Sequence, residues 1–206
     1  RAIAAQQTGF SFVAQLRDDV PDAMKGVLWF GVDDANTCVY VPVYNCVTTP
    51  PHCYEHGNGD MYHISWDAAF WVHNYVANQA YNRYSQMIPD IRKVQNKLED
   101  GIADEVAVAE KKALTMNDAD ARKMFVELPN RWAETSTKEF KALGDFLFVK
   151  YLDGNVKREK NGEFEYTPEG VPAYPTFPGY DQRYYRSIVK DSGDHFKVLT
   201  PSVGTK

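Results

Sequence analysis

The chain has 206 residues, which is enough for one well-packed domain or for a large part of a bigger one. Hydrophobic residues make up 44% and charged residues 25%, an ordinary balance for a globular protein. With a net charge of −5 and no basic stripe, we expect no nucleic-acid partner. No apolar run approaches the roughly 20 residues of a membrane-spanning helix, so we expect no membrane span.

The N-terminal region predicts three antiparallel strands. Phe10–Arg17 alternates with a two-residue period, which predicts a strand with one face on a core. Val27–Val32 is a continuous apolar run that we expect to be buried on both faces. Cys38–Tyr44 reads as a third strand, at a sheet edge or bulged because Pro42 cannot donate to a ladder. The short connections favour antiparallel pairing.

From Ser65 onward the pattern changes to a helical period. Ser65 can cap the helix, and Pro89 should bend or break it. One stripe repeats at steps of three and four residues, and we interpret its aromatic side chains as core rather than as a cofactor pocket. The stripe consists of Phe70, Ala77, Tyr81, Tyr84, Ile88, Ile91 and Leu98.

Two further helices are predicted. One spans Ala119–Glu134, and the other spans Lys138–Leu152 with Thr137 as its cap and Gly154 as its stop. The second has an apolar stripe of Phe140, Leu143, Leu147 and Tyr151. The segment after residue 155 alternates prolines with aromatic residues and predicts an extended tail. We therefore divide the chain into residues 1–155, with strands at about 10–45 and helices at about 65–153, and a surface-packed tail of residues 156–206.

A cluster of cysteines and histidines is the first candidate for chemistry. Cys46, Cys53, His56 and His63 could supply a tetrahedral zinc site, but no short cysteine pair is present and the two histidines are seven positions apart. We favour a loop without metal. A thiol and imidazole pair of Cys53 with His52 is disfavoured because adjacent side chains rarely face each other.

The three cysteines are an odd number, which argues against a disulfide framework. A Cys46–Cys53 bridge stays open and would favour an exported protein. We expect buried, reduced thiols.

Two acidic residues follow the second predicted strand. Asp33 and Asp34 could do acid–base work, although carboxylates at a strand end more often form a turn. No glycine-rich phosphate loop is present, and we expect no cofactor. The charged residues of the long helix read as a solvated face: Asp90, Arg92, Lys93, Lys97, Glu99 and Asp100.

Five segments in order resemble blocks of one enzyme family. They are FSFVAQLR, GVLWFGVDDA, VYVPVY, SWDAAFWVHNYVANQAYNRY and LGDFLFVKYLDGN. Together, from about Arg1 to Asn155, they resemble the bacterial dipeptidases of the N-terminal-nucleophile hydrolase superfamily, related to penicillin V acylase and bile-salt hydrolase.

The resemblance implies a fold and a mechanism. The fold would be an α+β sandwich in which two antiparallel sheets lie between helical layers, with this chain as its C-terminal portion. The nucleophile would be a cysteine at the mature N-terminus, with its own α-amino group as base, because a free amine titrates near pH 8. The substrates would be dipeptides, cleaved through an acyl-enzyme.

The chain departs from that family at its most important position. Cys38, Cys46 and Cys53 are internal, so we expect the nucleophile to lie outside this chain. The resemblance assigns Arg1 to the catalytic site, because related enzymes place an arginine before the corresponding strand. We therefore expect an inactive C-terminal part that associates with the missing N-terminal part of the same protein and forms a homo-oligomer. The alternative is a non-catalytic module that binds a peptide or a protein.

Overall fold

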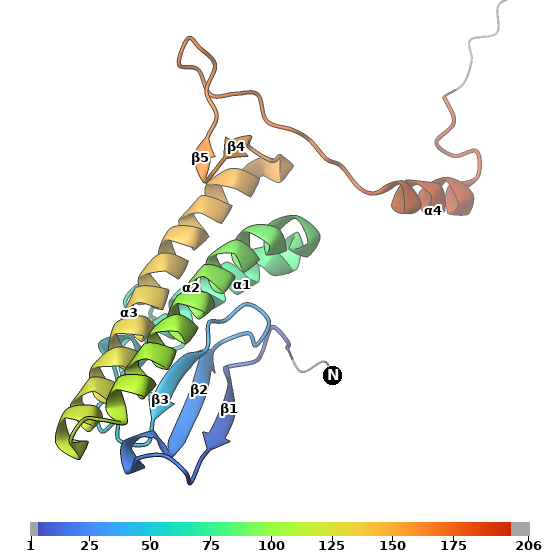
Figure 1. The fold of residues 1–206 in the computed structure, drawn as a ribbon. Helices are drawn as coiled ribbons and strands as arrows, with labels where there is room; N and C mark the ends of the chain where they lie inside the picture. The colour runs from blue at the N-terminus through green and yellow to red at the C-terminus, as the bar shows by residue number, and fades with distance from the viewer. Residues whose placement is uncertain (1–3, 199–206) are drawn as a thin grey trace, which may run out of the picture. The chain divides into compact units, whose positions relative to one another are not determined.

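The computed structural model describes residues 4–198 and divides the chain into two compact units, residues 1–149 and 150–206. The first unit holds a sheet and long helices, and the second holds a small hairpin and a short helix (Figure 1). The predicted α+β class with antiparallel strands followed by long helices is confirmed. No helix among the described residues combines the length and the apolar character that crossing a membrane requires.

The sheet of the first unit is antiparallel, in the order β1 (Phe10–Leu16), β2 (Gly26–Val32) and β3 (Val41–Tyr44). All three predicted strands are therefore confirmed, although β3 begins three residues later than expected. Pro42 lies opposite Trp29 on β3, which is an edge strand. An edge strand pairs on one side only, so proline, which lacks a backbone N–H, is tolerated there.

The first two helices are α1 (Ala69–Asn82) and α2 (Tyr84–Ala113). Arg83 separates them at φ −146° and ψ 47°, so the predicted helix breaks six residues before Pro89. Pro89 lies in the second turn of α2, where its missing N–H removes one hydrogen bond near the helix start. The predicted Ser65 cap is wrong, because Ser65 Oγ donates to Asn58 and α1 begins four residues later.

The predicted aromatic core of this region is partly wrong. Phe70 is 45% exposed and Tyr81 is 43% exposed. The buried face of α1 is made mainly of small residues, which allow another helix to approach closely. Gly144 of α3 has the same effect, because an added Cβ there would lie 2.5 Å from the ring of Tyr75 on α1. This buried face comprises Ala69, Val72, His73, Val76, Ala77 and Ala80.

Helix α2 follows the expected helical period. Its buried stripe repeats every three or four residues along eight turns of side chains, and it includes the predicted Ile91 and Leu98. The stripe is Met87, Ile91, Gln95, Leu98, Ile102, Val106, Ala109 and Ala113.

The two helices predicted after residue 118 are one continuous helix, α3 (Asp118–Tyr151). Thr137 does not cap a new helix, because its Oγ1 donates to the carbonyl of Ala133 one turn earlier. Asn117 does cap α3, accepting from the Asp120 amide at 3.0 Å. The predicted stripe is confirmed as buried: Phe140, Leu143, Leu147 and Tyr151. Figure 1 shows α2 and α3 side by side and antiparallel.

One face of the sheet packs on the helices. Tyr44 is fully buried there, its ring stacked on Phe125 of α3 with centroids 4.1 Å apart. The other face is open among the described residues, since Phe10 is 59% exposed and Phe12 is 55% exposed. The expectation that β1 places one face on a core is therefore wrong within this structure, because six of its seven residues are exposed.

The apolar run of β2 is buried only in part. Val27 and Val32 are buried, whereas Leu28, Trp29 and Phe30 keep intermediate exposure. Because side chains alternate along a strand, the buried Val27 and Val32 lie on opposite faces, so β2 is buried near its two ends rather than along one face.

The second unit is described by itself. Strands β4 (Glu159–Lys160) and β5 (Glu163–Phe164) form a hairpin whose turn residues, Asn161 and Gly162, both have positive φ. The predicted extended tail is corrected by α4 (Gln182–Ser192), which Asp181 caps by accepting from the Tyr184 amide. That the tail packs on a surface stays a prediction.

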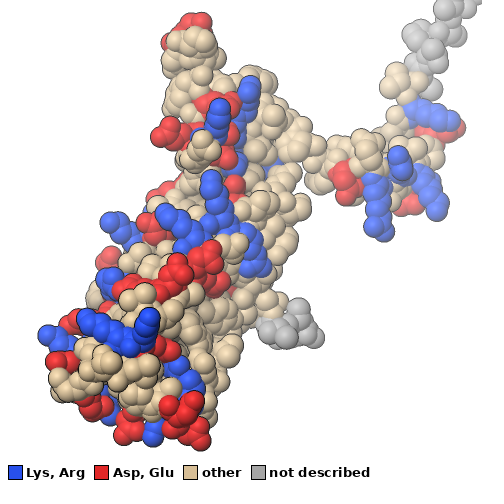
Figure 2. Space-filling view, in the orientation of Figure 1, with Lys and Arg blue, Asp and Glu red and all other residues tan. Residues whose placement is uncertain are grey.

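Charged side chains are interspersed on the face shown in Figure 2, where basic and acidic groups alternate over the helices. Several are paired one helical turn apart, such as Arg122 with Asp118 and Lys141 with Asp145. Pairs of this exposed kind contribute little to stability.

Candidate functional site

The connection between β2 and β3 folds back tightly on the strand it leaves. A Cβ at Gly31 would lie 2.5 Å from Cys38 Sγ, so only glycine fits this contact. Asp33 takes a left-handed backbone at φ 69°, a conformation that Asp tolerates better than most residues. The carbonyl of Asp34 accepts from the amides of Thr37 and Cys38 and closes the turn. We call residues 33–38 the acidic loop.

Both carboxylates of the acidic loop are buried. Asp33 accepts a hydrogen bond from Asn74 of α1 at 2.8 Å, and burial raises the pKa of Asp33. Asp34, which is 3% exposed, accepts from Thr37 Oγ1 at 3.1 Å and from the Tyr81 hydroxyl at 3.4 Å. The turn favoured from the sequence is present, and the structure adds burial of both carboxylates within it.

Helix α2 holds the acidic loop and the start of β3 through three polar side chains spaced one turn apart. The hydrogen bonds run from Arg92 Nη2 to Asn36 Oδ1, from Gln95 Nε2 to the Cys38 carbonyl and from the Tyr40 amide to Glu99 Oε1. The predicted solvated face is therefore wrong for Arg92 and Glu99, although Lys93, Lys97 and Asp100 are exposed as expected.

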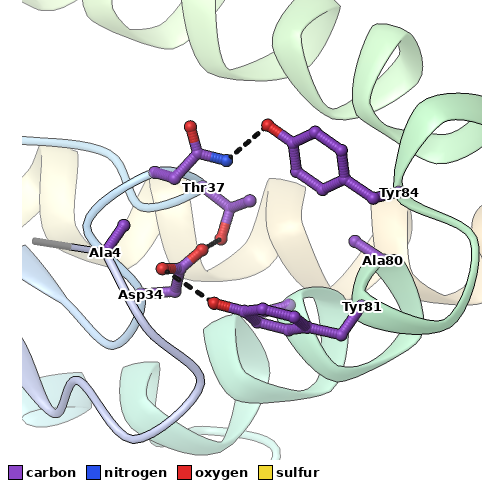
Figure 3. Close-up of a pocket in the computed structure, with 8 residues that line it drawn as sticks. Ala4, Asp34, Thr37, Ala80, Tyr81 and Tyr84 are labelled. Atoms are coloured by element: carbon purple, nitrogen blue, oxygen red, sulfur yellow. Dashed lines mark hydrogen bonds between the residues drawn. The ribbon is translucent and has the colours of Figure 1, made fainter. Parts of the chain in front are cut away.

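A pocket of about 230 Å³ lies between the acidic loop and the junction of α1 and α2 (Figure 3). The hydroxyl of Tyr81 points to Asp34, and the hydroxyl of Tyr84 accepts from Asn36 Nδ2 at 2.9 Å. Ala80 lies between the two tyrosine rings. The complete lining is Ala4, Asp34, Asn36, Thr37, Ala77, Ala80, Tyr81 and Tyr84.

Sequence reasoning singled out Asp34 but missed its pocket partners. Tyr81 and Tyr84 were interpreted as core because they continue a helical stripe, and Asn36 was interpreted as part of a connection. One sequence signal could have identified the tyrosines. When alanine and valine already fill the buried face of a helix, its aromatic residues lie outside the core and can line a pocket. The distance between the loop and the helix in the sequence hid the rest.

The cysteines are free and buried, as expected. Burial raises the pKa of Cys38 to about 11 and that of Cys53 to about 12, and it also raises the pKa of Cys46. Because the thiolate is the reactive form, all three are poor nucleophiles near neutral pH.

The four residues considered for a zinc site do not form one cluster. Cys46 Sγ contacts the carbonyls of Ala23 and Arg122, and His63 Nδ1 bonds to Asp60. Within residues 4–198, no three His, Cys, Asp or Glu side chains are grouped to hold a metal ion.

Two further sequence candidates are His52, paired with Cys53, and Arg1. His52 Nδ1 lies 2.9 Å from Glu55 Oε2, so its ring is engaged away from Cys53. Arg1, which the resemblance assigns to the catalytic site, lies outside the described residues. Ala4, three positions later in the chain, lines the pocket.

Comparison with known proteins adds the family. The model of Peptidase family C69 matches residues 1–97, a range that contains every residue lining the pocket.

A curated relative of this chain carries a more specific name. A "Probable dipeptidase" of Latilactobacillus sakei is 27% identical over 154 residues, which cover 75% of this chain and 31% of the relative. The chain therefore spans about a third of the length of the curated relative it matches. The resemblance to dipeptidases stated from the sequence is confirmed at the level of the family.

Proposed function

We propose that this chain is the C-terminal part of a dipeptidase whose nucleophile, an N-terminal cysteine, lies outside the 206 residues. The observation that carries the proposal is the match to Peptidase family C69, which spans the acidic loop, α1 and the first part of α2. The chain provides one wall of the substrate site and the helical layer behind it. The share of 31% of the relative's length agrees with a contribution of this size.

The open face of the sheet supports the sandwich architecture. Phe10 stacks on Phe12 with centroids 6.5 Å apart and on Phe30 at 5.8 Å, and these rings form an apolar surface. Apolar surface in water costs about 25 cal/mol per Å², so a patch of stacked aromatic rings favours a covering layer. A second sheet from the N-terminal part of the protein would cover it and complete an αββα sandwich.

The proposed reaction uses the terminal cysteine as both nucleophile and base. Its α-amino group takes the thiol proton, and the thiolate attacks the peptide carbonyl of the substrate. The second residue of the dipeptide leaves as an amine after protonation, and water then hydrolyses the acyl-enzyme. The buried thiols of this chain take no part, because their raised pKa values keep them protonated.

The test compares the chain with the longer protein. The 206-residue chain should hydrolyse none of a panel of dipeptides, whereas the protein extended at its N-terminus should hydrolyse some of them and lose activity when its N-terminal cysteine becomes alanine. Cys38→Ala in the longer protein is the matched control and should keep the activity. Turnover by the chain alone that disappears with Cys38→Ala would overturn the proposal.

The alternative is a non-catalytic module that binds a peptide or a protein. Its support lies in the second unit, where α4 exposes Tyr184, Tyr185 and Val189. The intact mass of the native protein discriminates between the two. A species much longer than 206 residues favours the dipeptidase, and a native chain of 206 residues favours the module.

A further inference from the structure

We propose that Asp34 binds the free α-ammonium group of the dipeptide's first residue, in the pocket between the acidic loop and the junction of α1 and α2. This inference rests on the proposed function and deepens it, because it names the substrate group that the pocket recognises. It also predicts that the substrate must have an unblocked amino terminus.

Within the described part of the chain, no basic side chain pairs with the carboxylates at the pocket. Asp33 and Asp34 are adjacent and buried, and their side-chain hydrogen bonds come from the neutral groups of Asn74, Thr37 and Tyr81. Among residues 4–198, neither carboxylate forms a salt bridge. Burying a carboxylate is costly unless a cation or good donors accompany it. A cationic ligand in the pocket would supply the positive charge that the described residues do not supply.

The nearby basic side chain is committed elsewhere. Arg92 donates through Nη2 to Asn36 and through Nη1 to Gln95, so its guanidinium is engaged by two neutral side chains. Arg92 thereby positions the amide of Asn36, whose Nδ2 donates to the Tyr84 hydroxyl. The arginine orders the rim of the pocket and leaves the charge of Asp34 available to a ligand.

The acceptors of the pocket match the three N–H donors of an ammonium group. The Asp34 carboxylate has about four acceptor positions, and two of them receive side-chain hydrogen bonds from residues that the structure describes, one a long contact of 3.4 Å from Tyr81. The Tyr84 oxygen receives one hydrogen bond from Asn36 and keeps a second lone pair. Figure 3 shows Asp34 and the two hydroxyls grouped at the same pocket.

The walls fit an amino-acid residue better than a metal ion. Ala4, Ala77 and Ala80 give the pocket small apolar sides, and aromatic rings such as that of Tyr81 attract ammonium groups. Calcium takes six to eight oxygen ligands, whereas Asp34 is the one carboxylate lining this pocket. The volume of about 230 Å³ is below the roughly 300–1,000 Å³ of drug-sized sites, so it suits one residue of a short peptide.

Calorimetry on the purified chain tests the inference directly. L-Ala-L-Ala should bind the 206-residue chain, and N-acetyl-L-Ala-L-Ala should bind at least about tenfold more weakly, because acetylation removes the charge. Asp34→Asn, which keeps the shape of the side chain, should weaken L-Ala-L-Ala by about tenfold and leave the acetylated peptide unchanged. A matched variant, Asp67→Asn, changes an exposed carboxylate outside the pocket and should bind like the parent.

The outcomes separate the inference from the proposed function. Equal affinity for the two peptides, no measurable binding, or an Asp34→Asn variant that is folded by circular dichroism and binds normally would overturn the inference. Ala80→Leu gives a second reading, since it leaves Asp34 intact but fills the pocket and should abolish binding. Turnover by the longer protein without preference for free amines would overturn only the inference. Binding by the 206-residue chain together with no turnover by the longer protein would overturn only the proposed function.

Discussion

Arg17 at the end of β1 and Glu110 on α2 form a two-pronged salt bridge, with Nη1 to Oε2 and Nη2 to Oε1 both at 2.8 Å. The Tyr44 hydroxyl donates to the same carboxylate at 3.0 Å. Burial opposes ionisation of Glu110, but the hydrogen bonds from Arg17 and Tyr44 outweigh it and lower its pKa. This contact joins the sheet edge to the helical layer across 93 residues of sequence.

Removing this carboxylate should destabilise the protein. We expect Glu110→Ala to lower the free energy of unfolding by about 2 kcal/mol, because the guanidinium and the Tyr44 hydroxyl lose a partly buried acceptor. Because the folded-state pKa of Glu110 is lowered, its contribution is present above its ordinary pKa and is lost as pH falls through the folded value.

Urea denaturation at neutral pH measures the effect of Glu110→Ala. Glu127→Ala is the matched control, since its exposed contact with Lys123 is 3.9 Å long and should contribute no more than about 0.5 kcal/mol. Equal losses in the two variants would show that the Arg17 contact adds nothing specific.

His73 should make folding stability depend on pH. Its ring is buried against Phe140 with centroids 4.3 Å apart, and burial lowers its pKa from 6.5 to about 4. The unfolded chain therefore takes up a proton first as pH falls. Stability should be unaffected above pH 6.5 and should fall by about 3 kcal/mol between pH 6.5 and 4 through this residue alone.

Urea melts of the parent and His73→Phe across that pH range test this expectation. The variant should lose the part of the pH dependence that His73 contributes, whereas His56→Gln, at an exposed position, should keep it. Parallel pH profiles for the parent and His73→Phe would contradict the assignment.

Gly31 should tolerate no side chain. An added Cβ would meet Cys38 Sγ at 2.5 Å, so we expect Gly31→Ala to cost about 1–3 kcal/mol through overpacking. Gly9→Ala, where nothing lies within 4 Å of the added atom, should change stability by less than about 0.5 kcal/mol. Thermal unfolding compares the two, and the acidic loop would be less tightly packed than described if both were neutral.

The open sheet face should drive self-association of the isolated chain. Phe12 and Leu16 are exposed on β1, an edge strand with free backbone groups on one side. Sedimentation velocity across a concentration series should show association, with hydrogen exchange slowed at Val27–Val32. Phe12→Gln should reduce association, and Val108→Gln, an exposed change on α2, should leave it intact. A strictly monomeric parent with the Val27–Val32 amides protected would favour the independent module.

The elements that local patterns decide could be predicted from the sequence. The three strands and the stripe through Phe140 and Leu147 follow from the side-chain period, which neighbouring residues alone determine. The blocks that resemble dipeptidases also lie in the order of the chain, and the family match agrees with them.

The tertiary structure decided what depends on distant partners. Thr137 reads as a helix cap, yet the packed helix keeps its hydroxyl on the Ala133 carbonyl. Tyr81 reads as core, yet α1 packs through alanines and leaves that ring beside Asp34. Asp34 and Tyr81 are 47 residues apart, and no local period relates them. The pocket exists because the acidic loop folds back over Gly31 while α2 holds it, and only the packed chain brings these contacts together.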